Sequence, residues 1–77
     1  MRRFIWDFRG RDGREIAAHH CTHLDGFAET HSIPIDAYIT GLIHENEFHS
    51  ISFIEVEQPF EQIVIDLLRP QRIEESK

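Results

Sequence analysis

The sequence predicts an α+β domain with the ferredoxin-like layout, in which two helices lie on one face of an antiparallel sheet. Apolar residues alternate with a period of two in segments 3–9, 35–44 and 48–57, which is typical of strands. They follow a spacing of three and four in 13–31 and after Pro59, which indicates two amphipathic helices. The order is β-α-β-β-α, with or without a final strand, and right-handed crossovers place both helices on one face.

The chain has 77 residues, so we expect residues 1–77 to form one domain. Hydrophobic residues make up 40% of it and charged residues 29%, which is the composition of a globular chain. Its core is small, and its single cysteine, Cys21, cannot form an intramolecular disulfide. Packing, a bound metal or self-association must therefore supply the stability.

The net charge of −6 argues against binding to duplex nucleic acid, because such binding depends on neutralising phosphates. No apolar run approaches the roughly 20 residues of a membrane-spanning helix, so no membrane association is expected. Asp7 lies where a signal peptide needs an apolar core, which favours a cytoplasmic location.

The first strand carries aromatic residues at alternate positions, and a turn follows it at Gly10. Asp12 and Glu15 have the spacing of a capping box and predict the start of the first helix. The buried arc of that helix is predicted to comprise Ile16, Ala17, His20, Cys21, Leu24, Phe27, Ala28 and His31. Pro34 restricts the residue before it to extended geometry and ends the helical region.

The segments 35–44 and 48–57 predict a hairpin with Glu45-Asn46 as a two-residue turn. In that register the sheet face away from the helices carries five large apolar residues, namely Ile5, Tyr38, Leu42, Ile51 and Phe53. A three-residue loop would shift the register and exchange the faces of one strand. The exposed apolar face is too large for a monomer and predicts a homodimer that buries these five residues.

The second helix is predicted to start near Pro59, which suits a first helical turn, and to close at Arg69-Pro70. Residues 71–77 are polar. They are expected to form either a short edge strand around 72–74 or a flexible tail.

Histidine stands out, with six in the chain and three of them within five positions. Residues three or four apart are neighbours on a helix, so two imidazoles there can reach one ion. The hairpin turns at the end of the sheet where this helix begins, which supplies further ligands. The predicted metal ligands are His19, His20, His23, His44 and His49. Imidazole suits a divalent transition metal such as zinc, nickel or copper.

Other interpretations of the histidines stay open. His20 and His31 lie within the apolar arc of the helix, where a neutral imidazole bonds to a neighbour or responds to pH. A small-molecule enzyme or sensor would use His20, His23 and His49 as acid–base groups. Ser50 and His49 are sequence neighbours whose side chains diverge, so they do not predict a nucleophile–base pair.

A second candidate is an anion site at the start of the first helix. Gly13 opens that helix, whose free N–H groups can hold an anion, and Arg11 and Arg14 would reinforce it. The alternative is a solvated, salt-bridged edge.

The W-D-F opening, the His-rich first helix, the H-S-I-S-F-I-E-V-E strand and the R-P-Q-R segment resemble a group of small uncharacterised bacterial ferredoxin-like proteins. The order of elements is also similar to a small nickel-binding family with the same βαββα layout and dimeric assembly. This resemblance concerns the layout and carries over no ligand residue. We therefore expect a small dimeric metal- or ligand-binding protein, with a pure protein-interaction module as a further alternative.

Overall fold

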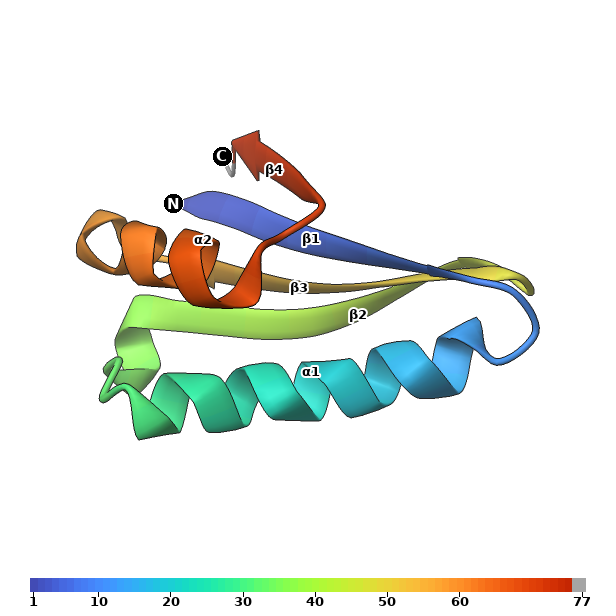
Figure 1. Ribbon diagram of the computed structural model, residues 1–77, viewed down its shortest axis with the longest axis horizontal. Helices are drawn as coiled ribbons and strands as arrows, with labels where there is room; N and C mark the ends of the chain where they lie inside the picture. The colour runs from blue at the N-terminus through green and yellow to red at the C-terminus, as the bar shows by residue number, and fades with distance from the viewer. Residues whose placement is uncertain (76–77) are drawn as a thin grey trace.

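The computed structural model describes residues 1–75, which form an α+β structure compatible with a ferredoxin-like layout (Figure 1). Its elements are β1 (Arg2–Arg9), α1 (Gly13–Thr30), β2 (Tyr38–Asn46), β3 (His49–Val56), α2 (Glu61–Leu68) and β4 (Arg72–Glu75). Two 3-10 turns, η1 (Ile35–Ala37) and η2 (Gln58–Phe60), precede β2 and α2. The four strands form one sheet in the order β2-β3-β1-β4, and all neighbouring strands are antiparallel.

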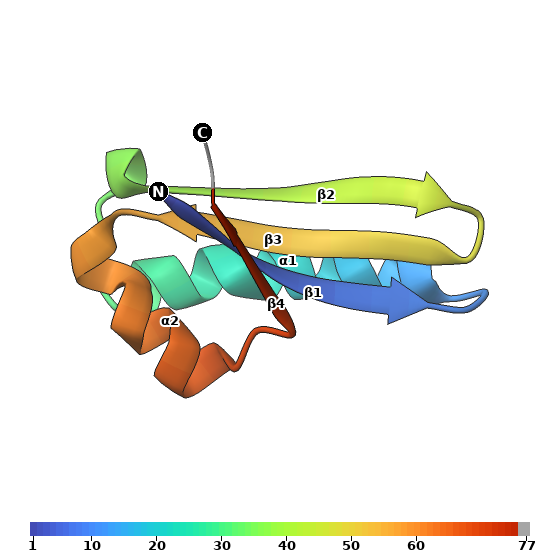
Figure 2. The ribbon, with the colours of Figure 1, turned by 90° about the horizontal axis from the view of Figure 1, so that it is seen from above.

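One hydrophobic core joins the two helices to the sheet. Leu24 of α1 and Val64 of α2 belong to the same buried cluster as four residues of the central strands, Phe4, Trp6, Ile54 and Val56. Both helices therefore pack on the sheet face that these residues line. In Figure 2, α1 lies behind the strands and α2 lies beside it near the end where β1 begins.

Helix α1 begins differently from the sequence-based expectation. Asp12 is the N-cap residue, but its side chain makes no capping hydrogen bond, so the predicted capping box with Glu15 is wrong. Close packing fixes the start instead, because a Cβ on Gly13 would lie 2.6 Å from the carbonyl oxygen of Phe8. Only glycine lets the helix approach β1 so closely.

The buried arc of α1 is narrower than the sequence predicts. Its buried residues are Gly13, Ala17, Leu24 and Ala28. Ile16 is 50% exposed, and His31 is exposed with its ring against Phe27. The helix ends at Thr30, and the N–H of His31 bonds back to the carbonyl of Phe27, so His31 caps the helix rather than packing into the core.

The predicted hairpin turn at Glu45-Asn46 is wrong. Strand β2 continues to Asn46, and the turn lies between Asn46 and His49. The Asn46 side chain accepts a hydrogen bond from the Phe48 backbone N–H at 2.8 Å, which is the geometry of an Asx turn. This local bond moves the turn two residues along the chain and shifts the register, so Leu42 pairs with Ser52.

The shifted register exchanges the faces of β2. Tyr38 packs against the helix-side core, and the Thr40 hydroxyl donates to Asp25 of α1 at 2.5 Å. Leu42, two residues further on, shares that side. The sheet face away from the helices is called the open face below. The expectation that Tyr38 and Leu42 lie on it is therefore wrong, and Ile39 and Ile43 take their place.

The open face of the sheet is partly closed by its own side chains. Ile5, Ile51 and Phe53 lie on it, as the sequence predicts, but they form a cluster that is already buried in the single chain, where the sequence predicts exposed residues. The Phe53 ring lies across Gly41 of β2, where an added Cβ would meet the ring at 2.5 Å. Arg3 covers the ring with its guanidinium 4.1 Å from the centroid.

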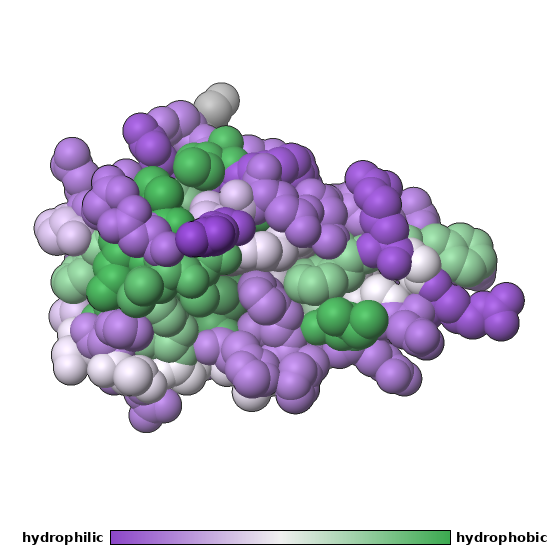
Figure 3. All heavy atoms as spheres, viewed as in Figure 1, coloured by the Kyte–Doolittle hydropathy of each residue, from purple (hydrophilic) through white to green (hydrophobic). Residues whose placement is uncertain are grey.

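Helix α2 is shorter than predicted, because η2 takes up its first turn around Pro59 and the left-handed Arg69 ends it. Apolar side chains gather over α2, whereas mostly hydrophilic ones cover α1 and β4 (Figure 3). Residues 72–75 form β4, which confirms the short edge strand; residues 76–77 of the predicted tail lie outside the described residues. Within residues 1–75, neither helix has the length and apolarity that a membrane crossing requires.

Candidate functional site

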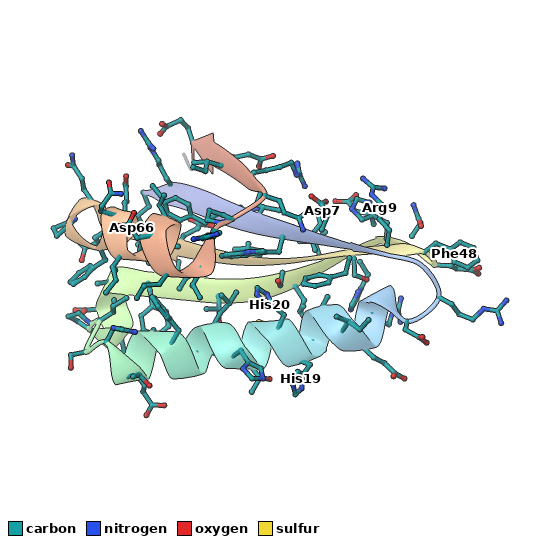
Figure 4. The ribbon with its side chains drawn as sticks, in the orientation of Figure 1. Asp7, Arg9, His19, His20, Phe48 and Asp66 are labelled. Atoms are coloured by element: carbon teal, nitrogen blue, oxygen red, sulfur yellow. The ribbon has the colours of Figure 1, made fainter. Side chains whose placement is uncertain are left out.

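The five nominated histidines occupy separate places in the fold. His19 and His23 lie on the outer side of α1, whereas His20 lies between α1 and the sheet (Figure 4). His44 is on the helix side of β2, and His49 is on the open face of β3. The structure therefore brings together only the two histidines that are one helical turn apart.

His19 and His23 lie side by side, as their one-turn spacing predicts. Their Nε2 atoms are 2.9 Å apart, and the ring centroids are 4.5 Å apart with the planes tilted by 57°. Both side chains are exposed, so an ion from solution can reach the two nitrogens directly. In the free protein, one Nε2–H donates to the other Nε2 across this gap.

The 2.9 Å separation is that of the hydrogen-bonded, metal-free pair, and an ion that replaced the shared proton at this separation would be held at a definite angle. With metal–nitrogen bonds of about 2.0–2.1 Å, atoms 2.9 Å apart subtend an angle of about 90° at the ion. Adjacent ligands in square-planar and octahedral sites have this angle, and copper(II) and nickel(II) prefer such sites. A tetrahedral zinc site needs a wider separation of about 3.3 Å.

His20 is one residue from His19 but belongs to the interior. Its Nδ1 is 2.6 Å from the Ser52 hydroxyl, and its ring contacts Trp6 and Phe8 at centroid distances of 4.9 and 5.3 Å. Burial lowers the pKa of His20 below its ordinary value of 6.5, and the nearby charge of His23 lowers it further. These contacts make His20 a neutral packing residue between helix and sheet.

His44 and His49 also have partners of their own. His44 Nδ1 is 2.8 Å from the hydroxyl of Ser50, which is 1% exposed. His49 Nε2–H donates to Asp7 at 2.7 Å on the opposite face of the sheet. The expectation that the hairpin brings both residues to the helix histidines is not met. In the described part of the chain, no three His, Cys, Asp or Glu side chains are grouped to hold an ion.

Asp7 is the centre of the polar cluster on the open face. Arg72 of β4 donates to both carboxylate oxygens, with Nε–Oδ2 at 2.9 Å and Nη2–Oδ1 at 3.0 Å. This bond to Arg72 is the main reason that the pKa of Asp7 is lowered, and the bond to His49 adds to it. Both carboxylate oxygens of Asp7, Nε2 of His49 and the guanidinium nitrogens of Arg72 bond to other side chains, which indicates a role in joining β1, β3 and β4.

The nominated anion site has less free backbone than the sequence implies. The N–H of Gly13 already donates to the carbonyl of Gly10 at 3.1 Å. Arg11 and Arg14 are exposed, which fits the alternative of a solvated edge.

The two serines that hold histidines were missed by the sequence analysis. Ser50 and Ser52 alternate with Ile51 and Phe53, so the placement of these apolar residues on the open face implies that both serines face α1. That alternation is the sequence pattern from which the orientation of the two serines could have been predicted. The partner of each serine could not be found without the register of β2 and the rotation of α1.

Comparison of the chain with protein families, with curated proteins and with solved structures finds no match.

Proposed function

We propose that the protein binds a divalent transition metal such as copper(II), nickel(II) or zinc through His19 and His23. The observation that carries this proposal is the 2.9 Å separation of two exposed Nε2 atoms. Pairs of histidines four residues apart on a helix are effective chelators, because the backbone already holds both rings on one side. Little side-chain entropy is then lost on binding.

The pair supplies two of the four to six ligands that such an ion takes. The remaining positions face solvent, so water or donor atoms of a second molecule complete the coordination. This arrangement corresponds to an open site, which exchanges its ion and accepts an external ligand, rather than to a closed structural site.

Metal binding at this pair is linked to protons. The hydrogen bond between the rings uses one Nε2–H, and the ion replaces that proton because a ligating nitrogen must be free of hydrogen. An ion beside His23 also places positive charge near His20, whose pKa the charge of His23 already lowers. Protonation and metal binding therefore oppose each other along this stretch of α1.

The test is a titration of untagged protein with nickel and zinc, followed through the histidine ring NMR signals. The rings of His19 and His23 should respond together and saturate at micromolar metal. His19→Ala and His23→Ala should each abolish the response, whereas His31→Ala is the matched control, because His31 is exposed at the end of the same helix and has no histidine partner. A response confined to His31 or His44, or no saturation, would refute the proposal.

The alternative of acid–base catalysis by His20, His23 and His49 receives less support. His20 contacts a serine hydroxyl, as a general base would, but Ser52 is 0% exposed. A substrate cannot reach that hydroxyl while α1 is packed on the sheet. The three histidines also lie on three different surfaces, so they do not converge on one reacting group.

The element order and the strand order β2-β3-β1-β4 support the proposal that the fold is a complete ferredoxin-like sandwich, with β4 as its last strand.

A further inference from the structure

Strand β2 forms an edge of the sheet, and its register irregularity lies between His44 and Asn46, which leaves residues 38–44 regular. It is nine residues long, and among the described residues β3 is the one strand paired with it. Figure 2 shows it along the border of the sheet, with no helix or strand outside it other than η1 near its start. Three large apolar side chains on it are exposed, namely Ile39, Leu42 and Ile43, and it contains no proline, lysine or arginine. Such an edge is a template for another strand.

The backbone groups of β2 that point outward can be identified from its pairing with β3. The N–H of Glu57 donates to the carbonyl of Ala37 at 3.0 Å, and these residues are opposite each other in the register of the hairpin. Because bonded and non-bonded pairs alternate in antiparallel strands, the odd residues of β2 bond inward to β3. The even residues Tyr38, Thr40, Leu42 and His44 therefore direct their N–H and C=O groups away from the sheet.

The open-face side chains of β2 are symmetric about Gly41, because Ile39 and Ile43 flank it at equal distances along the strand. On the helix side the flanking residues differ, with Thr40 and Tyr38 before Gly41 and Leu42 and His44 after it. In an inverted copy of the strand centred on Gly41, each isoleucine therefore meets an isoleucine on the open face.

We propose that a second copy of this chain pairs antiparallel along β2, with a two-fold axis at Gly41, and so forms a continuous eight-stranded sheet. In this register Tyr38 of one copy forms a bonded pair with His44 of the other, and Thr40 pairs with Leu42 in the same way. These four residues are the ones whose backbone groups point away from the sheet. Ile39 packs against Ile43 of the second copy in non-bonded pairs, where side chains approach most closely. No like charges are opposed, since Glu45 meets Ala37.

The apolar surface that the open face still exposes lies at its β2 edge rather than at its centre. On that face Ile5, Ile51 and Phe53 are only 3%, 5% and 9% exposed in the single chain, so they have little area left to bury. Ile39 and Ile43 beside them are 54% and 36% exposed. Edge pairing covers these two residues and satisfies the free backbone groups at the same time. It does not depend on the proposed metal site.

Sedimentation of charged variants tests the dimer and its register. Wild-type protein is expected to be a dimer at tens of micromolar. The I39K/I43K variant opposes lysines across the axis and should weaken association by at least about 100-fold while remaining folded. The I39K/I43E variant opposes each lysine to a glutamate of the second copy and should restore the dimer, because positions 39 and 43 of one chain are too far apart to pair with each other. Leu67→Lys, at an exposed residue of α2, is the control and should leave association unchanged.

Amide hydrogen exchange of the wild-type protein gives an independent test that requires no variant. The N–H groups of Thr40, Leu42 and His44 should become protected as protein concentration rises, while those of β4 should not change. A wild-type chain that stays monomeric at millimolar concentration would overturn the proposal. So would a dimer that I39K/I43K leaves intact, or one that I39K/I43E fails to restore.

Discussion

The two sides of α1 carry the same residue type in different surroundings. His20 faces the sheet, where it bonds to Ser52 and contacts two aromatic rings. His19 faces solvent, where its Nε2 lies 2.9 Å from Nε2 of His23, one turn away. One helical residue is a rotation of about 100°. That rotation separates an imidazole that stabilises the fold from a pair that is available to a ligand, so the number of histidines in a segment says little about its function until the helix is oriented.

The largest difference between the two sides should appear in stability. His20→Ala removes a ring that fills the space beside Trp6 and Phe8 and leaves the buried Ser52 hydroxyl without its partner. We expect a loss of about 2–3 kcal/mol in the free energy of unfolding, measured with urea. His19→Ala removes an exposed ring and should change stability by less than about 0.5 kcal/mol. Equal losses of unfolding free energy in His20→Ala and His19→Ala would contradict the proposed difference between the two sides of α1.

The second difference is in the response to pH. The folded state lowers the pKa of His20 below its ordinary value of 6.5, so the unfolded chain binds this proton more readily. Stability is therefore complete above about pH 6.5 and falls as the pH drops through the lowered pKa. Urea unfolding at pH 7.5 and at pH 5 should show this loss, and His20→Gln, which cannot titrate, should make it smaller. An unchanged pH dependence in His20→Gln would place the titrating group elsewhere.

A smaller loss of stability is expected at lower pH, and it comes from Asp7 on the open face rather than from α1. The bonds to Arg72 and His49 lower the pKa of Asp7 below 3.8, so the carboxylate contributes stability above that value. This contribution is lost as the pH falls through the lowered pKa. Asp7→Asn should reduce the loss of stability between pH 4 and pH 2 but leave the loss between pH 7.5 and pH 5 intact. Thermal unfolding of both proteins between pH 7.5 and pH 5, and between pH 4 and pH 2, measures the loss of stability in each interval.

The positions of the strands and helices were predictable because each follows from local patterns. The alternation in β1 and β3 and the three-four spacing in α1 depend only on residues near one another in the chain. The i,i+4 spacing of His19 and His23 gave the one pair of nominated ligands that does come together.

The remaining parts of the site depended on two features that local patterns do not specify. The Asx turn at Asn46 moved the hairpin turn and so decided which side of β2 carries His44 and Leu42. The close approach at Gly13 set how α1 lies on the sheet and so which histidine meets Ser52. A shift of one residue exchanges faces on a strand and turns a helix position by about 100°, so local patterns could not specify which of the five predicted ligands would meet.

The most direct test of the central claim is a double-mutant cycle on copper(II) affinity, measured by competition with a chelator of known strength. If His19 and His23 hold one ion together, then His19→Ala, His23→Ala and the double variant should weaken binding by nearly the same factor. The cycle should give a coupling energy of about 2–3 kcal/mol. His31→Ala should bind as the wild type does. Additive losses from the two single variants, or an affinity that neither variant changes, would contradict the chelating pair.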